Sequence, residues 1–194
     1  MSPVFGKVIW ALGVVVWYAI RFPAQRRARK LGVARSVGGL GDRTALVIAA
    51  IGQFLVPGIY TFTGWPAAAD YPLHVVQAAI GLVVLAAALT LFRVTHKQLG
   101  RNWSVTLETR SDHGLVTTGL YAWVRHPMYS SFLLFAVAQA LLLPNWIAGL
   151  AGLVGFGVLF FYRVNREEAM MAEAFADAYR TYAQRTARLI PWLY

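Results

Sequence analysis

The sequence predicts an all-α integral membrane protein with about five transmembrane helices, the last two forming a helical hairpin, followed by a cytoplasmic amphipathic C-terminal helix. Two observations carry this prediction. Of the 194 residues, 58% are hydrophobic and only 13% are charged, whereas soluble domains average about 45–50% apolar and about 25% charged residues. The apolar residues also fall in long runs, close to the roughly 20 residues that a helix needs to cross a bilayer. A formal charge of +10 would suit a nucleic-acid partner, but basic soluble domains lack such runs, so none is expected.

Three of these runs lie in the N-terminal half: Val4 to Ile20, Ala45 to Thr63 and Pro72 to Phe92. They are uncharged apart from Lys7. The first run has the position of a signal peptide, but Lys7 interrupts it and no small-residue cleavage site follows before Arg21. We therefore expect a retained membrane anchor.

The C-terminal half carries two shorter uncharged runs, Pro127 to Leu143 and Trp146 to Tyr162, separated only by Pro144 and Asn145. This spacing predicts a helical hairpin. Its second arm contains Gly149, Gly152 and Gly155, which allow close helix packing or leave room for a bound molecule.

The tail from Arg163 to Tyr194 has helical periodicity. One face would be apolar and the other charged, as in an amphipathic helix on a surface. The apolar positions are Met171, Phe175, Ala178 and Tyr182, opposite Glu173, Asp177 and Arg180.

The basic residues predict the orientation. Of the 18 Lys and Arg residues, 17 fall in the segments 21–43, 93–125 and 163–188, the exception being Lys7, and the loop from Gly64 to Tyr71 has none. By the positive-inside rule these segments are cytoplasmic, so the N-terminus is outside and the C-terminus inside. The same charge favours anionic headgroups, which makes membrane lipids expected partners.

Several kinds of chemistry lack the residues they need. There is no cysteine, which excludes thiolate catalysis, disulfides and iron–sulfur ligation. His74, His96 and His113 occur without the spacing of metal ligands, so no metal is expected. A glycine-rich phosphate loop and a GxGxxG element are also missing, which argues against a soluble dinucleotide-binding fold.

The sequence RHPMY, Arg125 to Tyr129, opens the first arm of the hairpin. Pro127 suits the first turn of a helix, whose N-terminus favours an anionic group. On the other interpretation, Arg125 reaches lipid phosphates, His126 caps the helix and Tyr129 belongs to the aromatic belt.

A second polar cluster, Arg163, Arg166, Glu167 and Glu168, follows the second arm. An antiparallel hairpin would bring it beside Arg125 and His126. Ionisable residues at a membrane edge are candidates for function, and the meeting of two such clusters favours a functional site over an ordinary charge pair.

With these residues in view, the sequence resembles the isoprenylcysteine carboxyl methyltransferase family, and more loosely the wider group of membrane phospholipid methyltransferases. The resemblance covers about the C-terminal half. It is carried by LGRNWS (Leu99 to Ser104), GLVTTGLYAWVRHPMY (Gly114 to Tyr129), Glu167–Glu168 and RLIP (Arg188 to Pro191).

The resemblance implies an integral membrane enzyme that takes a methyl group from S-adenosylmethionine in a cytosol-facing pocket. Residues 1–194 would form a single membrane domain, with three N-terminal helices in residues 1–92 and a cofactor-binding catalytic half in residues 93–194. By the same resemblance, the cofactor would be walled by Leu115, Val116, Gly119 and Tyr121, and its polar end held by Arg125, His126, Pro127 and Tyr129. Glu167 would take ribose hydroxyls or the ammonium group, while Arg163, or Arg166 in its place, and Glu168 would lie near the methyl-transfer site.

The expected acceptor is a lipophilic small molecule that enters from the bilayer, such as an isoprenyl-cysteine-like carboxylate. Three alternatives remain open: a phospholipid amine N-methyltransferase, an NADPH-dependent membrane reductase of the steroid-reductase type, and a non-enzymatic scaffold or transporter.

Overall fold

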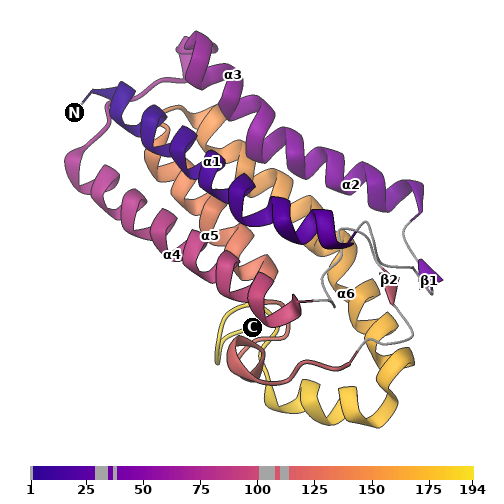
Figure 1. The fold of residues 1–194 in the computed structure, drawn as a ribbon. Helices are drawn as coiled ribbons and strands as arrows, with labels where there is room; N and C mark the ends of the chain where they lie inside the picture. The colour runs from indigo at the N-terminus through magenta and orange to yellow at the C-terminus, as the bar shows by residue number, and fades with distance from the viewer. Residues whose placement is uncertain (1, 29–34, 37–38, 101–107, 110–113) are drawn as a thin grey trace.

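The computed structural model describes residues 2–28, 35–36, 39–100, 108–109 and 114–194, which form a bundle of long helices (Figure 1). Residues Arg101 to Ser104 of the LGRNWS element, and His113, lie outside the described residues. The long elements are α1 (Pro3–Ala28), α2 (Leu40–Ala50), the π-helix η1 (Ile51–Leu55), α3 (Val56–Thr63), α4 (Val75–Leu99), α5 (Pro127–Leu142) and α6 (Trp146–Arg185). The short ones are β1 (Arg35–Ser36), β2 (Glu108–Thr109), and the 3-10 helices η2 (Ala67–Ala69) and η4 (Gly119–Ala122).

Among the described residues, four helical segments are long and apolar enough to cross a membrane: α1, residues 40–63 (α2, η1 and α3 end to end), α4 and α6. In the apolar windows of the first three, only 17%, 22% and 28% of residues are buried, against 50% in α6. Their outward faces carry exposed apolar side chains, such as Val15 and Val83, as lipid contact requires. The multi-pass all-helical prediction is therefore confirmed, apart from the two-residue pairing of β1 with β2. A fifth crossing stays a prediction, because α5 is apolar but has 16 residues.

The predicted hairpin is present as α5 and α6, and Asn145 fixes its tip. The Asn145 Oδ1 atom accepts hydrogen bonds from the N–H groups of Ile147 and Ala148, at 3.1 and 2.9 Å, which caps α6. Its Nδ2 donates to Asp70 Oδ1 at 2.8 Å and to the Pro66 carbonyl at 2.7 Å. The tip is thus tied to the loop that connects α3 with α4.

Close backbone approach holds α6 against its neighbours. A Cβ on Gly52 of η1 would lie 2.2 Å from the Ala151 carbonyl oxygen, and one on Gly155 would lie 3.1 Å from Ala49 Cα. Buried Gln139 of α5 donates to the Gly52 carbonyl at 3.2 Å, which links α5 to η1. Gly149, Gly152 and Gly155 of α6 therefore serve close helix packing rather than leaving room for a ligand.

The helix of the second hairpin arm does not end at Tyr162. It continues as α6 to Arg185, with a break at Ala176 (φ 45°, ψ −122°), after which its last turns run across the end of the bundle (Figure 1). Tyr179 is buried there, whereas Ala178 is exposed. A separate amphipathic helix on the membrane surface stays a prediction.

Candidate active site

The RHPMY motif and the paired glutamates meet where α5 begins beside α6. His126 Nε2 lies 3.3 Å from Glu168 Oε1, and its Nδ1 lies 3.5 Å from Glu167 Oε2. The Tyr129 hydroxyl donates to Glu167 Oε1 at 2.6 Å, and Arg125 Nε donates to Glu168 Oε1 at 2.9 Å. The predicted meeting of the two polar clusters is thus present in the structure.

These contacts differ from those that the second interpretation of the motif, a helix cap with an arginine at the lipid phosphates, would require. His126 is the N-cap residue of α5, yet its side chain makes no capping hydrogen bond and turns to the glutamates instead. The Arg125 side chain is 10% exposed and paired with Glu168, so it does not extend toward lipid phosphates. Pro127 is buried in the first turn, and two carboxylates lie near the helix N-terminus, where the helix dipole favours them.

The environment of His126 favours its protonated form. Burial by itself lowers the pKa of the imidazole, but the hydrogen bonds and charges of Glu167 and Glu168 outweigh burial and raise the pKa above its usual value. The cluster therefore holds an imidazole between two carboxylates, an arrangement that favours the imidazolium form.

Arg163, rather than Arg166, belongs to this cluster. Arg163 Nε lies 2.9 Å from Asp42 Oδ1 and 3.6 Å from Glu167 Oε1, and the side chain is 8% exposed. Arg166 is exposed, and its guanidinium lies 4.2 Å from the ring of Tyr162. Of the two arginines that the sequence left open, Arg163 is the one whose side chain lies in the cluster.

Hydrogen bonds from the C-terminal segment, residues 186–194, fix the position of the RHPMY motif. The Arg125 N–H donates to the Ala187 carbonyl at 2.8 Å, and the His126 N–H donates to the Arg188 carbonyl at 3.0 Å. The Ser130 hydroxyl donates to the Leu189 carbonyl at 2.6 Å. Arg188 Nη2 donates to Glu168 Oε2 at 2.8 Å, so the RLIP element contributes a charge to the cluster.

The remaining predicted residues lie around η4, before the motif. Tyr121 is buried, and burial raises the pKa of its phenol, which keeps it neutral. Gly119 has φ +64°, and a Cβ there would lie 2.1 Å from Gln98 Nε2 of α4, so glycine is required. Leu115 and Val116 are half-buried in the extended segment before η4. Within the described ranges they make no hydrogen bond or ion pair with the cluster.

The family model of the isoprenylcysteine carboxyl methyltransferase (ICMT) family matches residues 79–173, which contain the motif, Arg163 and both glutamates. The chain is similar to that family over this segment.

Relatives in this family share about half of the chain. A protein-S-isoprenylcysteine O-methyltransferase of Schizosaccharomyces pombe is 35% identical over 96 residues, which are 48% of this chain and 41% of the relative. One from Tribolium castaneum is 32% identical over 116 residues, 59% of this chain and 41% of the relative. The chain thus spans less than half the length of these two relatives.

A solved structure extends the similarity to the fold. The structure of the eukaryotic intramembrane Ras methyltransferase of this family matches with a TM-score of 0.57 and 28% identity, over 80% of this chain and 55% of that one. The match to an integral membrane enzyme agrees with the apolar helices described above.

Two residues of the cluster were missed from the sequence, and both lie outside the segment that the ICMT family model matches. Asp42, on α2, is 1% exposed, and Arg188 lies in the tail. A signal for Asp42 was present: it is a carboxylate among basic residues, directly before an apolar run. Arg188 belongs to the RLIP element, but nothing in the sequence indicated that it contacts Glu168.

Proposed function

We propose that this protein is a membrane methyltransferase that uses S-adenosylmethionine to methylate the carboxylate of a lipophilic, isoprenyl-cysteine-like acceptor. The observation that carries the proposal is the placement of His126 between Glu167 and Glu168, with Arg163 beside Glu167, within the segment that the ICMT family model matches. The names of the relatives support the same reaction.

The residues of the cluster fit the proposed cofactor. S-adenosylmethionine presents an ammonium group, a carboxylate and a ribose diol, and when bound it supplies an electrophilic methyl group on a sulfonium. Glu167 would accept from the ammonium group or the ribose hydroxyls. Arg125 and protonated His126 would hold the carboxylate. An aromatic and apolar wall would come from Leu115, Val116, Gly119, Tyr121, Pro127 and Tyr129.

The charges of the cluster favour an anionic acceptor. With His126 in the protonated form that the two glutamates favour, the cluster has an excess of one positive charge. The cations are then Arg125, Arg163, Arg188 and His126, and the anions are Asp42, Glu167 and Glu168. A carboxylate acceptor neutralises this excess, whereas a protonated amine adds to it.

A carboxylate also needs no general base. Its oxygen attacks directly, and the protein contributes orientation and exclusion of water, for which Arg163 is placed to make a charge-assisted contact. An amine acceptor would need a base such as Glu168. That carboxylate is already held by Arg125, His126 and Arg188, which stabilises its ionised form and makes it a poor proton acceptor. Its role here is to position these three cations.

For the topology we propose five crossings, with α5 as the additional one, the N-terminus outside and the C-terminus in the cytoplasm. The three basic segments, 21–43, 93–125 and 163–188, meet at one end of the bundle, because β1 pairs with β2 and the Arg125 N–H donates to the Ala187 carbonyl. The cofactor would arrive from this end, and the acceptor laterally from the lipid. Since Asp42 joins Arg163, the N-terminal helices of residues 1–92 and the catalytic half, residues 93–194, would act as a single domain.

Calorimetric titration of the detergent-purified protein tests the proposal. S-adenosylhomocysteine should bind, and binding should be lost in His126→Ala and Glu167→Ala but kept in Arg166→Ala. NADPH binding in its place would favour a reductase, and binding of neither would favour a scaffold or transporter. Radiolabelled methyl transfer to a prenylated cysteine, with its carboxamide as the matched control acceptor, then tests the acceptor chemistry.

A further inference from the structure

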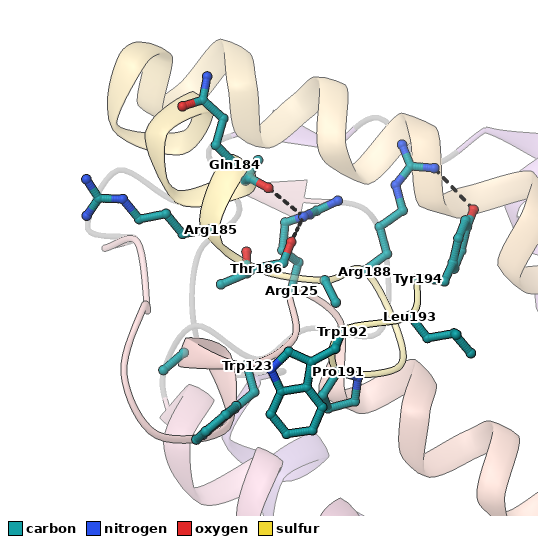
Figure 2. Close-up of a pocket in the computed structure, with 13 residues that line it drawn as sticks. Trp123, Arg125, Gln184, Arg185, Thr186, Arg188, Pro191, Trp192, Leu193 and Tyr194 are labelled. Atoms are coloured by element: carbon teal, nitrogen blue, oxygen red, sulfur yellow. Dashed lines mark hydrogen bonds between the residues drawn. The ribbon is translucent and has the colours of Figure 1, made fainter.

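A pocket of about 690 Å³ lies between the loop before α5 and the C-terminal tail (Figure 2). Trp123 and Arg125 line it from the loop, and Arg185, Arg188 and Trp192 line it from the tail. Among the residues that the structure describes, none of the side chains that line it is acidic. The pocket is therefore suited to an anion.

The walls of this pocket are amphipathic. Figure 2 shows the indole rings of Trp123 and Trp192 together, away from the guanidinium groups of Arg125 and Arg188. The two ring centroids are 5.3 Å apart. Trp192 is 86% exposed and Leu193 is 79% exposed, so apolar surface lies open directly beside the basic side chains.

The position of the pocket points to the membrane surface. It lies directly before α5, at the level where the apolar helices end and the basic segments gather. Tryptophan is enriched at this level in membrane proteins, and basic residues there attract anionic headgroups. Arg185 is exposed and, within the described part of the chain, has no ion-pair partner.

We propose that this pocket binds the headgroup of an anionic phospholipid, with the phosphate attracted by Arg188 and by Arg185, which lie on opposite sides of the pocket (Figure 2), and the apolar part of the lipid against Trp123 and Trp192. The lipid here is a bound regulator and not the methyl acceptor.

Arg188 connects this pocket with the proposed active site. It lines the pocket and also donates to Glu168 Oε2 at 2.8 Å. A phosphate bound by Arg188 competes with Glu168 for the same guanidinium. Because Glu168 also holds Arg125 and His126, lipid binding changes the cluster that would hold the cofactor. This coupling rests on the proposed function, whereas the lipid site itself does not.

Titration of the detergent-purified protein with short-chain phosphatidylglycerol, phosphatidylcholine and inorganic phosphate tests the lipid site. Phosphatidylglycerol should bind most tightly, and Arg185→Gln should weaken it about fivefold, the factor that about 1 kcal/mol per basic residue at a membrane surface gives. The matched control is Arg180→Gln, because Arg180 is 72% exposed, paired with Asp177 and outside the pocket wall. Trp192→Ala should weaken the binding of phosphatidylglycerol and phosphatidylcholine by the same factor.

Equal binding of the two lipids, binding of inorganic phosphate as tight as that of phosphatidylglycerol, or an unchanged Arg185→Gln variant would overturn the lipid site. The coupling is measured as the affinity for S-adenosylhomocysteine in nanodiscs with and without phosphatidylglycerol, and equal affinities would overturn it. A protein that binds no S-adenosylhomocysteine refutes the proposed function, while the lipid titration remains interpretable.

Discussion

The ion pair between Asp42 and Arg163 offers the most direct test of how the N-terminal helices support the site. The Asp42→Asn substitution keeps the shape of the side chain and removes its charge. Both partners are buried, at 1% and 8% exposure, and their atoms lie 2.9 Å apart. Removing one partner of a buried pair costs about 3–5 kcal/mol. Glu167 Oε1 lies 3.6 Å from the same Arg163 nitrogen and compensates part of the loss, so we expect about 2–3 kcal/mol.

A double-mutant cycle measures this energy. Asp42→Asn, Arg163→Met and the double variant are unfolded in detergent, and the affinity for S-adenosylhomocysteine is measured alongside. The double variant should be more stable than the sum of the two losses implies, because no buried charge is left unpaired. Asp177→Asn is the control, since that residue forms an exposed pair with Arg180, which contributes little. A coupling energy below about 0.5 kcal/mol, the usual limit of additivity, would refute the reasoning.

Three other contacts give measurable outcomes. Arg163→Ala should lower radiolabelled methyl transfer to a carboxylate acceptor by about tenfold or more, since hydrogen bonds to charged groups contribute about 1.5–3 kcal/mol. The activity of the control Arg166→Ala should stay near that of the wild type. Equal losses in both variants would contradict the choice of Arg163 as the arginine that contacts the acceptor. Gly52→Ala should lower the free energy of unfolding by about 3 kcal/mol, the upper end for overpacked cores, because its Cβ would meet the Ala151 carbonyl. The control Gly58→Ala places its Cβ in open space and should be tolerated. Similar melting temperatures for the two variants would argue against close packing at Gly52. The raised pKa of His126 means that the folded chain binds this proton more tightly than the unfolded chain. Its stabilising contribution is therefore complete below about pH 6.5, the ordinary value, and is lost as the pH rises through the raised pKa; a His126→Gln variant with the same pH dependence would exclude this cause.

The sequence predicted the membrane class, the hairpin and the meeting of His126 with the glutamates. These features depend on local information. Long apolar runs require a membrane, and a two-residue connection between such runs forces antiparallel neighbours. Once the arms are antiparallel, the residue before Pro127 and the doublet after Tyr162 must approach one another.

The contributions of Asp42 and Arg188 could not be predicted in the same way. They reach the cluster from α2 and from the tail, and no sequence spacing specifies how a separate helix is rotated or where a tail folds back. The choice of Arg163 over Arg166 has the same origin. The two lie three residues apart on one helix, and only the packing of α2 against α6 shows which side is buried.

By itself, the sequence determined that this chain is a membrane protein, that its positive charge lies at one end, and that His126 and the paired glutamates lie together. Hydrophobicity and chain connectivity impose these properties locally. Only the tertiary structure shows which charges are paired. It also shows that the C-terminal tail forms hydrogen bonds with the RHPMY motif and lines a basic pocket that contains two tryptophans. The physical reason is that a buried charge needs its partner within about 4 Å, and contacts at that range between distant segments are set by the packing of whole helices.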